Sequence, residues 1–129
     1  MAIRSRWWNQ GADDHLDLAR HSPLTFIDEP RLMEVSVGAW DGMSLYEIGV
    51  EYPDALKGAD AFDWLFRSPD GETFDHACQR LRTWLSEVST PAVAISHGLT
   101  GRLLRGVYLG MSPTRDVGAA GLARRVLSA

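Results

Sequence analysis

The chain has 129 residues, a single cysteine and a formal net charge of −4. This length fits one domain, residues 1–129, with a sizeable core. The charge gives no basic field that would attract nucleic acid, and no apolar run approaches the ~18 residues of a membrane span. One cysteine excludes an internal disulfide, and the N-terminus shows no signal-peptide pattern. We therefore expect a cytoplasmic protein.

The first quarter of the chain predicts few elements. Residues 1–14 have no clear period, whereas His15–His21 shows helical spacing that ends before Pro23, since the residue before proline avoids the α region. Leu24–Ile27 predicts a short strand that is closed by a turn. Three acids lie near the start of this expected helix: Asp13, Asp14 and Asp17. Acids are favoured at helix starts, which explains them more simply than a metal site does.

Arg31–Gly42 predicts a loop of unusual content. Gly38 and Gly42 flank a tryptophan, and Glu34 precedes them. Glycines in such a loop indicate backbone angles that other residues avoid. From the residue types alone, Glu34 is either an ordinary surface acid, which composition favours, or a positioned proton donor.

Two helices are expected in the middle of the chain. Ser44 and Glu47 match a capping box, in which the hydroxyl caps the helix start and the glutamate reaches back. This helix should run to about Tyr52, before a proline. A second helix is expected from Asp54 toward Phe66.

A longer helix is expected from about Glu72 to Val88, after a turn. Its apolar residues recur every three or four positions and form one stripe: Phe74, Ala77, Cys78, Leu81, Trp84, Leu85 and Val88. Because Cys78 belongs to this stripe, we expect a buried, inert thiol rather than a nucleophile.

Ala92–Ile95 is a continuous apolar run, typical of a strand buried on both faces of a parallel sheet. A polar turn follows, and a new helix is expected from about Leu99 to a C-cap at Gly110. Ligands bind at the carboxyl ends of such strands, and helix starts favour anions. His97, in this turn, is therefore either a phosphate-handling residue or a polar cap without chemistry.

Three fragments in this order resemble the histidine phosphatase superfamily, which contains the cofactor-dependent phosphoglycerate mutases and broad-specificity phosphatases. They are Leu32-Met33-Glu34 followed by Gly38-Ala39-Trp40-Asp41-Gly42, then Pro69-Asp70-Gly71-Glu72-Thr73, then Ser96-His97-Gly98. The resemblance covers residues 15–113. It implies a three-layer α/β/α fold with a mostly parallel sheet.

The resemblance also implies a reaction and its residues. The family hydrolyses or transfers phosphomonoesters through a phosphohistidine, a form of nucleophilic catalysis that needs no metal and no bound cofactor. Glu34 takes the position of the proton donor and His97 that of the second histidine, with Gly98 and Ser96 as substrate-binding residues. Val37 stands where mutases often place a tyrosine, which favours a phosphatase. Structural roles around the pocket are implied for Glu72 and Arg80.

The sequence departs from the family at both ends. No Arg-His-Gly, the motif of the nucleophile, occurs in the chain. Ser5 matches the next motif, but Asn9 stands where a phosphate-binding arginine belongs, and an amide lacks its charge and fork. The resemblance is lost again after Pro113. We expect a truncated or frame-altered reading frame of impaired activity, acting on a small phosphorylated molecule.

A missing first strand has a further consequence. Its neighbours in the sheet should expose unpaired edges, so we expect marginal monomer stability and homo-oligomers formed through those edges.

Two other interpretations stay open. One is a non-catalytic module of the same fold that binds phosphate or a partner. The other is an active phosphatase that uses His15, His21 or His76 as nucleophile, although none of them follows a buried strand. A zinc site is not favoured, because His76 and Cys78 lack further ligands at zinc spacing.

Overall fold

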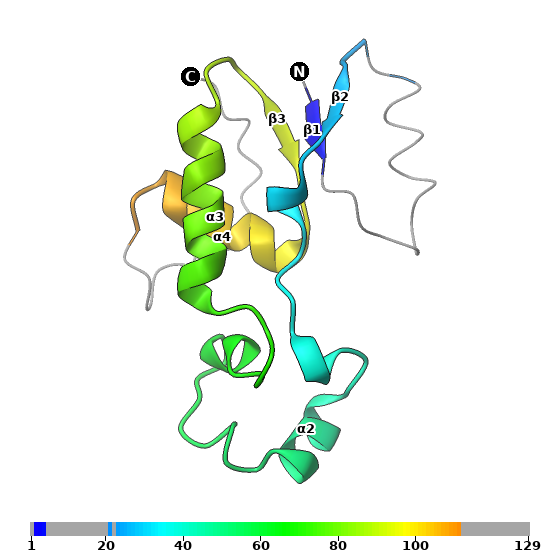
Figure 1. The fold of residues 1–129 in the computed structure, drawn as a ribbon, viewed down its shortest axis with the longest axis vertical. Helices are drawn as coiled ribbons and strands as arrows, with labels where there is room; N and C mark the ends of the chain where they lie inside the picture. The colour runs from blue at the N-terminus through cyan, green and yellow to red at the C-terminus, as the bar shows by residue number, and fades with distance from the viewer. Residues whose placement is uncertain (1, 5–20, 22, 112–129) are drawn as a thin grey trace. The chain divides into compact units, whose positions relative to one another are not determined.

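A computed structural model of the chain describes residues 2–4, 21 and 23–111 (Figure 1). The expected helix at residues 15–21, apart from His21, and all positions after residue 111 lie outside the described residues. The chain divides into two compact units. The first comprises residues 1–34 and 80–129, and the second comprises residues 35–79.

The first unit is built on a three-stranded sheet. Its strands are β1 (Ala2–Arg4), β2 (Phe26–Asp28) and β3 (Val93–Ile95). They lie in the order β2-β1-β3, and both pairs are parallel. Figure 1 shows β1 between its two neighbours. The β2 strand confirms the one expected near residues 24–27.

The β1 strand corrects our expectation for the N-terminus. We expected no strand there and hence unpaired edges inside the sheet. Instead, Ile3 is in register with Ile27 on one side and with Ala94 on the other. The inner edges of β2 and β3 are therefore paired, and the reason for expecting a marginal monomer falls away. A strand of three residues is too short to show a period of two, which is why the sequence did not indicate it.

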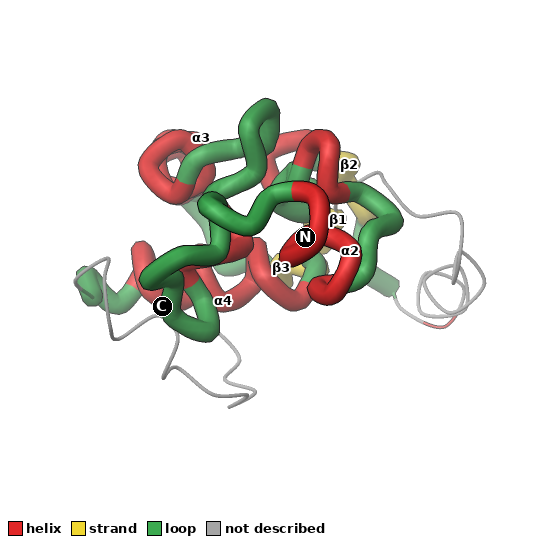
Figure 2. The backbone as a smooth tube through the Cα atoms, turned by 90° about the horizontal axis from the view of Figure 1, so that it is seen from below, coloured by secondary structure: helices red, strands yellow, loops and turns green. Residues whose placement is uncertain are grey.

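Among the described residues, two α-helices also contribute to the first unit. The helix α3 (Phe74–Glu87) begins in the second unit and ends in the first, and α4 (Gly98–Tyr108) follows β3 (Figure 2). Both confirm the predicted helices within a few residues. The buried apolar side chains of this unit come from these helices and from the turn before Glu34: Leu32, Leu81, Trp84, Leu103 and Leu104.

The β3 strand is less buried than its sequence suggests. Val93 is 48% exposed, and Ala94 and Ile95 are partly buried. The expectation of a strand buried on both faces is therefore wrong, because the side chain of Val93 is open to solvent. β3 is also an edge strand of the described sheet. Within the described part of the chain, no helix is long and apolar enough to cross a membrane.

The second unit contains the helix α2 (Leu45–Glu51) and two short 3-10 helices, η2 (Gly38–Trp40) and η3 (Asp63–Phe66). The capping box is present: Glu47 N donates to Ser44 Oγ at 3.2 Å, and Ser44 N donates to Glu47 Oε2 at 2.7 Å. Trp40 is 2% exposed and stacks on Trp64, with ring centroids 6.2 Å apart. An aromatic core therefore holds this unit.

The α-helix expected from residue 54 to residue 66 does not form. Turns occupy most of this range, and only its last part is helical, as η3. Gly58 has φ +69°, a left-handed conformation that interrupts a helix. The Asp60 carboxylate accepts from the backbone of Phe62 and Asp63, at 2.8 and 2.6 Å, and so starts a new turn there.

Candidate functional site

Glu34 lies at the N-terminus of α4, the helix that His97 precedes. Its Oε1 accepts from the backbone N–H of Thr100 at 2.8 Å, and its Oε2 accepts from that of Leu99 at 3.2 Å. The first helical N–H groups have no partner within the helix, and a carboxylate there also meets the positive end of the helix dipole. Glu34 therefore acts as a cap for α4, supplied by a distant part of the chain.

His97 is the residue that immediately precedes α4. It has extended backbone angles, φ −87° and ψ 171°, and its carbonyl accepts from Gly101 N at 2.8 Å. Its side chain makes no capping hydrogen bond to the helix. The imidazole therefore does not cap α4, unlike in the alternative of a polar cap without chemistry.

Arg80, on α3, holds the turn that leads into Glu34. Its Nη2 donates to the Met33 carbonyl at 3.0 Å, and its Nη1 donates to the Arg31 carbonyl. Hydrogen bonds from a charged group are stronger than neutral ones. Arg80 thus fixes the backbone on the N-terminal side of Glu34, which agrees with the structural role that the family resemblance implied for it.

Two hydroxyl groups complete this attachment from the other side of the turn. Ser96 Oγ donates to the Leu32 carbonyl at 2.7 Å, and Thr100 Oγ1 lies 2.7 Å from the Met33 carbonyl. Thr100 is fully buried. Three consecutive carbonyls before Glu34, those of residues 31 to 33, are therefore each bound by a side chain from α3, from the end of β3 or from α4. The Ser96 hydroxyl, expected at the substrate, is directed to the backbone.

An ion pair stabilises the same turn. Arg31 Nε lies 2.8 Å from Glu29 Oε1, and Arg31 Nη1 lies 2.8 Å from Glu87 Oε2. The hydrogen bond from Arg31 lowers the pKa of Glu29, and burial only partly opposes this effect. The hydrogen bonds to Glu29 and Glu87 raise the pKa of Arg31, so it stays charged. This pair connects the turn to the end of α3.

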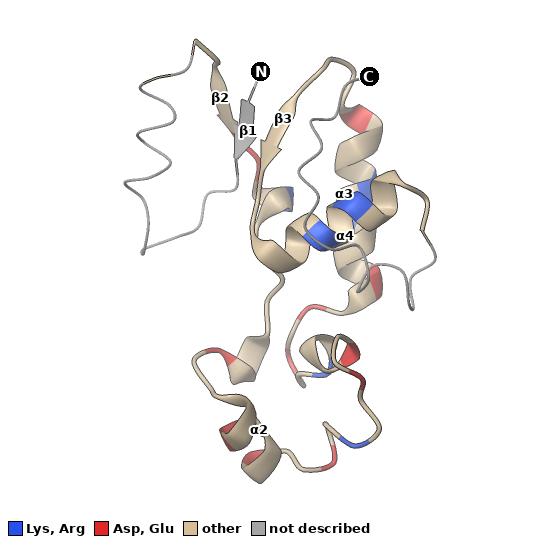
Figure 3. Ribbon diagram, turned by 180° about the vertical axis from the view of Figure 1, so that it is seen from behind, with Lys and Arg blue, Asp and Glu red and all other residues tan. Residues whose placement is uncertain are grey.

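The backbone at Gly98 is open to an approaching ligand. Gly98 is exposed, and a Cβ atom placed on it would meet no protein atom within 4 Å. The helix that it starts contains Arg102 and Arg105 and no acidic residue. Figure 3 shows basic residues on α4, whereas α3 carries both basic and acidic residues. Helix N-termini of this kind attract anions such as phosphate.

The structure brings the four predicted site residues together within the first unit. Glu34 contacts the start of α4, and Ser96, His97 and Gly98 form the connection from β3 into that helix. Glu72 belongs to the second unit, where its Oε1 lies 3.0 Å from His76 Nδ1. No group of three His, Cys, Asp or Glu suited to a metal ion occurs among the described residues.

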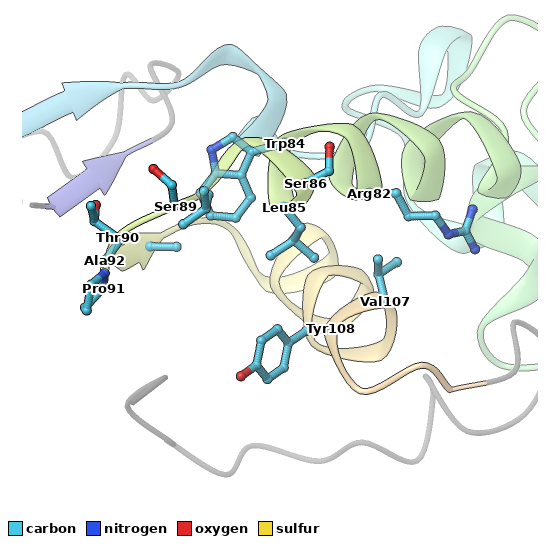
Figure 4. A pocket seen from close by; sticks show the side chains of 12 residues that line it. Arg82, Trp84, Leu85, Ser86, Ser89, Thr90, Pro91, Ala92, Val107 and Tyr108 are labelled. Carbon is cyan, nitrogen blue, oxygen red and sulfur yellow. The ribbon is translucent and has the colours of Figure 1, made fainter. Parts of the chain in front are cut away.

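A separate pocket of about 530 Å³ lies in the first unit (Figure 4). The end of α3, the start of β3 and the end of α4 line it, through residues such as Trp84, Ala92 and Tyr108. None of the four predicted site residues contributes to its wall. The pocket is therefore not formed by the residues at the start of α4 that the sequence predicts as the site.

Comparison with known proteins identifies the family. The family model described as "Histidine phosphatase superfamily (branch 1)" matches residues 15–118. The chain therefore belongs to the histidine phosphatase superfamily, which confirms the resemblance drawn from its motifs.

A solved structure shares the fold. The protein titled "Mycobacterial hydrolase 1" superposes with a TM-score of 0.75 at 21% sequence identity. The match covers 96% of this chain and 65% of that protein, so the chain spans less than two thirds of its relative's length. A search of curated proteins found no match.

Proposed function

We propose that this chain binds phosphomonoesters at the start of α4, as a phosphatase-like or mutase-like protein whose turnover is impaired. The observation that carries the proposal is that the Glu34 carboxylate is hydrogen-bonded to the first turn of the helix that His97 precedes. Two motifs far apart in the sequence suggested these residues, and the carboxylate of one is bound to the helix that the other precedes. The family supports the class of substrate.

The chemistry of the site suits this role. A phosphate oxygen would accept from the Gly98 N–H and the His97 imidazole, at a helix start that favours negative charge. Phosphoryl transfer depends on positioning and charge stabilisation, and Glu34 would protonate the departing oxygen. The chain has no Arg-His-Gly motif to supply the usual nucleophile. Loss of a covalent nucleophile typically costs several orders of magnitude in rate.

We extend the proposal to the domain as a whole. Residues 1–129 would form one three-layer α/β/α domain with a mostly parallel sheet. A cytoplasmic location fits the single buried cysteine, which would remain reduced there.

A second candidate function is a binding module without catalysis. The observation that favours it is that polar groups of the site already form hydrogen bonds within the protein. Glu34 already caps α4, and Ser96 already binds the Leu32 carbonyl. These groups can therefore be retained for structural reasons after a reaction is lost.

The direct test is a titration with inorganic phosphate, followed by melting temperature and by the amide resonance of Gly98. A ligand that binds only the folded state raises the melting temperature. We expect saturable binding that His97→Gln weakens and that the matched variant His21→Gln leaves unchanged. Absence of any phosphate effect on the melting temperature and on Gly98 contradicts the proposal.

Hydrolysis then separates the two candidate functions. Phenyl phosphate has a poor leaving group and needs the acid, whereas 4-nitrophenyl phosphate needs it much less. If the chain turns over at all, we expect Glu34→Gln to slow phenyl phosphate hydrolysis more strongly. Phosphate binding without turnover of either ester, and without a trapped phosphohistidine, favours the binding module. A trapped phosphohistidine that His21→Gln or His76→Gln abolishes would instead identify a different nucleophile.

A further inference from the structure

Thr100 places both of its donor groups beside the same oxygen of Glu34. Its backbone N–H donates to Oε1 at 2.8 Å, and its Oγ1 lies 3.0 Å from the same atom. The side chain is fully buried within the first turn of α4. The other carboxylate oxygen, Oε2, accepts from Leu99 N at the longer distance of 3.2 Å. The two oxygens of Glu34 are therefore chemically different.

The Thr100 hydroxyl has a choice of acceptor, because the Met33 carbonyl lies 2.7 Å from it. A hydroxyl carries one proton and can donate it to one acceptor at a time. Arg80 Nη2 already donates to the Met33 carbonyl at 3.0 Å, so this carbonyl keeps a donor when the hydroxyl turns away. A negatively charged carboxylate is the stronger acceptor, and when Glu34 is protonated its carbonyl oxygen still accepts a hydrogen bond. The proton of Thr100 is thus available to Oε1.

From this geometry we propose that Thr100 is a positioning residue that determines which oxygen of Glu34 carries the acidic proton. An oxygen that accepts two hydrogen bonds is favoured as the carbonyl oxygen of a carboxylic acid, and so the proton resides on Oε2. The inference rests on the proposed function, in which Glu34 gives that proton to the leaving oxygen. Thr100 exchanges no proton and forms no covalent bond; it holds Oε1 as an acceptor before and after the transfer.

Infrared spectroscopy tests this assignment. The C=O stretch of protonated Glu34 is isolated in the difference between wild type and Glu34→Gln, in the acidic range where circular dichroism shows a folded chain. Thr100→Val removes the hydroxyl but keeps the branched shape, whereas Thr100→Ser keeps the hydroxyl. We expect the stretch to move to higher wavenumber in Thr100→Val, because the carbonyl oxygen loses a donor, and to stay near the wild-type position in Thr100→Ser.

An unchanged stretch in Thr100→Val overturns the proposal, since the hydroxyl then donates only to Met33 or the proton resides on Oε1. If Thr100→Val does not fold, Thr100→Ala provides the same comparison with a smaller side chain. The phosphate titration is run on the same samples. Phosphate binding with an unchanged stretch refutes the role of Thr100 and retains the proposed function. A shifted stretch without phosphate binding supports the hydrogen-bond assignment and refutes the proposed function.

Discussion

Replacement of Glu34 should weaken the folded state even in the absence of any substrate, because its carboxylate caps α4. Glu34→Ala removes acceptors for the N–H groups of Leu99 and Thr100, now 3.2 and 2.8 Å from the carboxylate oxygens. Loss of a helix cap costs about 1 kcal/mol, and loss of a negative charge at a helix start about 0.3–1 kcal/mol. Since Glu34 is exposed and solvent screens its charge, we expect a total loss of about 1–2 kcal/mol.

Urea unfolding followed by far-UV circular dichroism measures this loss. We expect Glu34→Gln to lose roughly half as much, because its amide oxygen still accepts a hydrogen bond while the charge is gone. Glu51→Ala is the matched control, since this exposed residue is the last in α2 and caps no helix start. It should change the free energy of unfolding by less than about 0.5 kcal/mol. Equal stability of Glu34→Ala and wild type would refute the capping role.

Three further outcomes follow from the structure. Gly98→Ala should weaken phosphate binding measured by titration. Gly101→Ala, which also has room for a methyl group, should leave binding intact and add about 0.5–1 kcal/mol of stability. Equal effects of the two variants on binding would contradict the proposed site. Hydrogen bonds from the Ser44 backbone and side chain lower the pKa of Glu47. The capping box therefore stabilises α2 at pH values above the usual pKa of glutamate, and this stabilisation is lost as the pH falls through the lowered pKa. An NMR titration of Glu47 should show a lowered pKa, and Ser44→Ala should partly restore the usual value. Leu81→Ala, at a fully buried position of α3, should cost about 2–5 kcal/mol in urea unfolding, and a smaller loss would mean that α3 is not part of the core.

The elements that could be predicted from the sequence are those with strong local signals. The capping box before α2 and the apolar stripe of α3 are local patterns, and the structure follows both. The strand Ala2–Arg4 had no such signal, because pairing with both neighbours stabilises it rather than its own composition. In the 54–66 segment, helical spacing was outweighed by Gly58 and by hydrogen bonds from the Asp60 side chain.

The candidate site was predictable in part. Ordered motifs indicated Glu34 and His97, and the structure places the Glu34 carboxylate at the helix that His97 precedes. The contacts that fix the turn before Glu34 were not apparent, because Arg80 and Ser96 bind backbone carbonyls. A carbonyl belongs to every residue, so sequence patterns do not show which ones need a donor. For Arg80, the family resemblance implied a structural role near the pocket without showing which groups it binds.

The buried thiol of α3 offers a way to observe how this protein opens. Cys78 is the only cysteine in the chain and is 3% exposed, as the apolar stripe predicted. A thiol reagent can reach Cys78 only when α3 separates from the residues packed against it, so the labelling rate measures how often α3 opens. Because the chain has a single thiol, one added mass of the reagent distinguishes labelled from unlabelled molecules. The dependence of the labelling rate on added phosphate would show whether a ligand at α4 reduces the opening of α3.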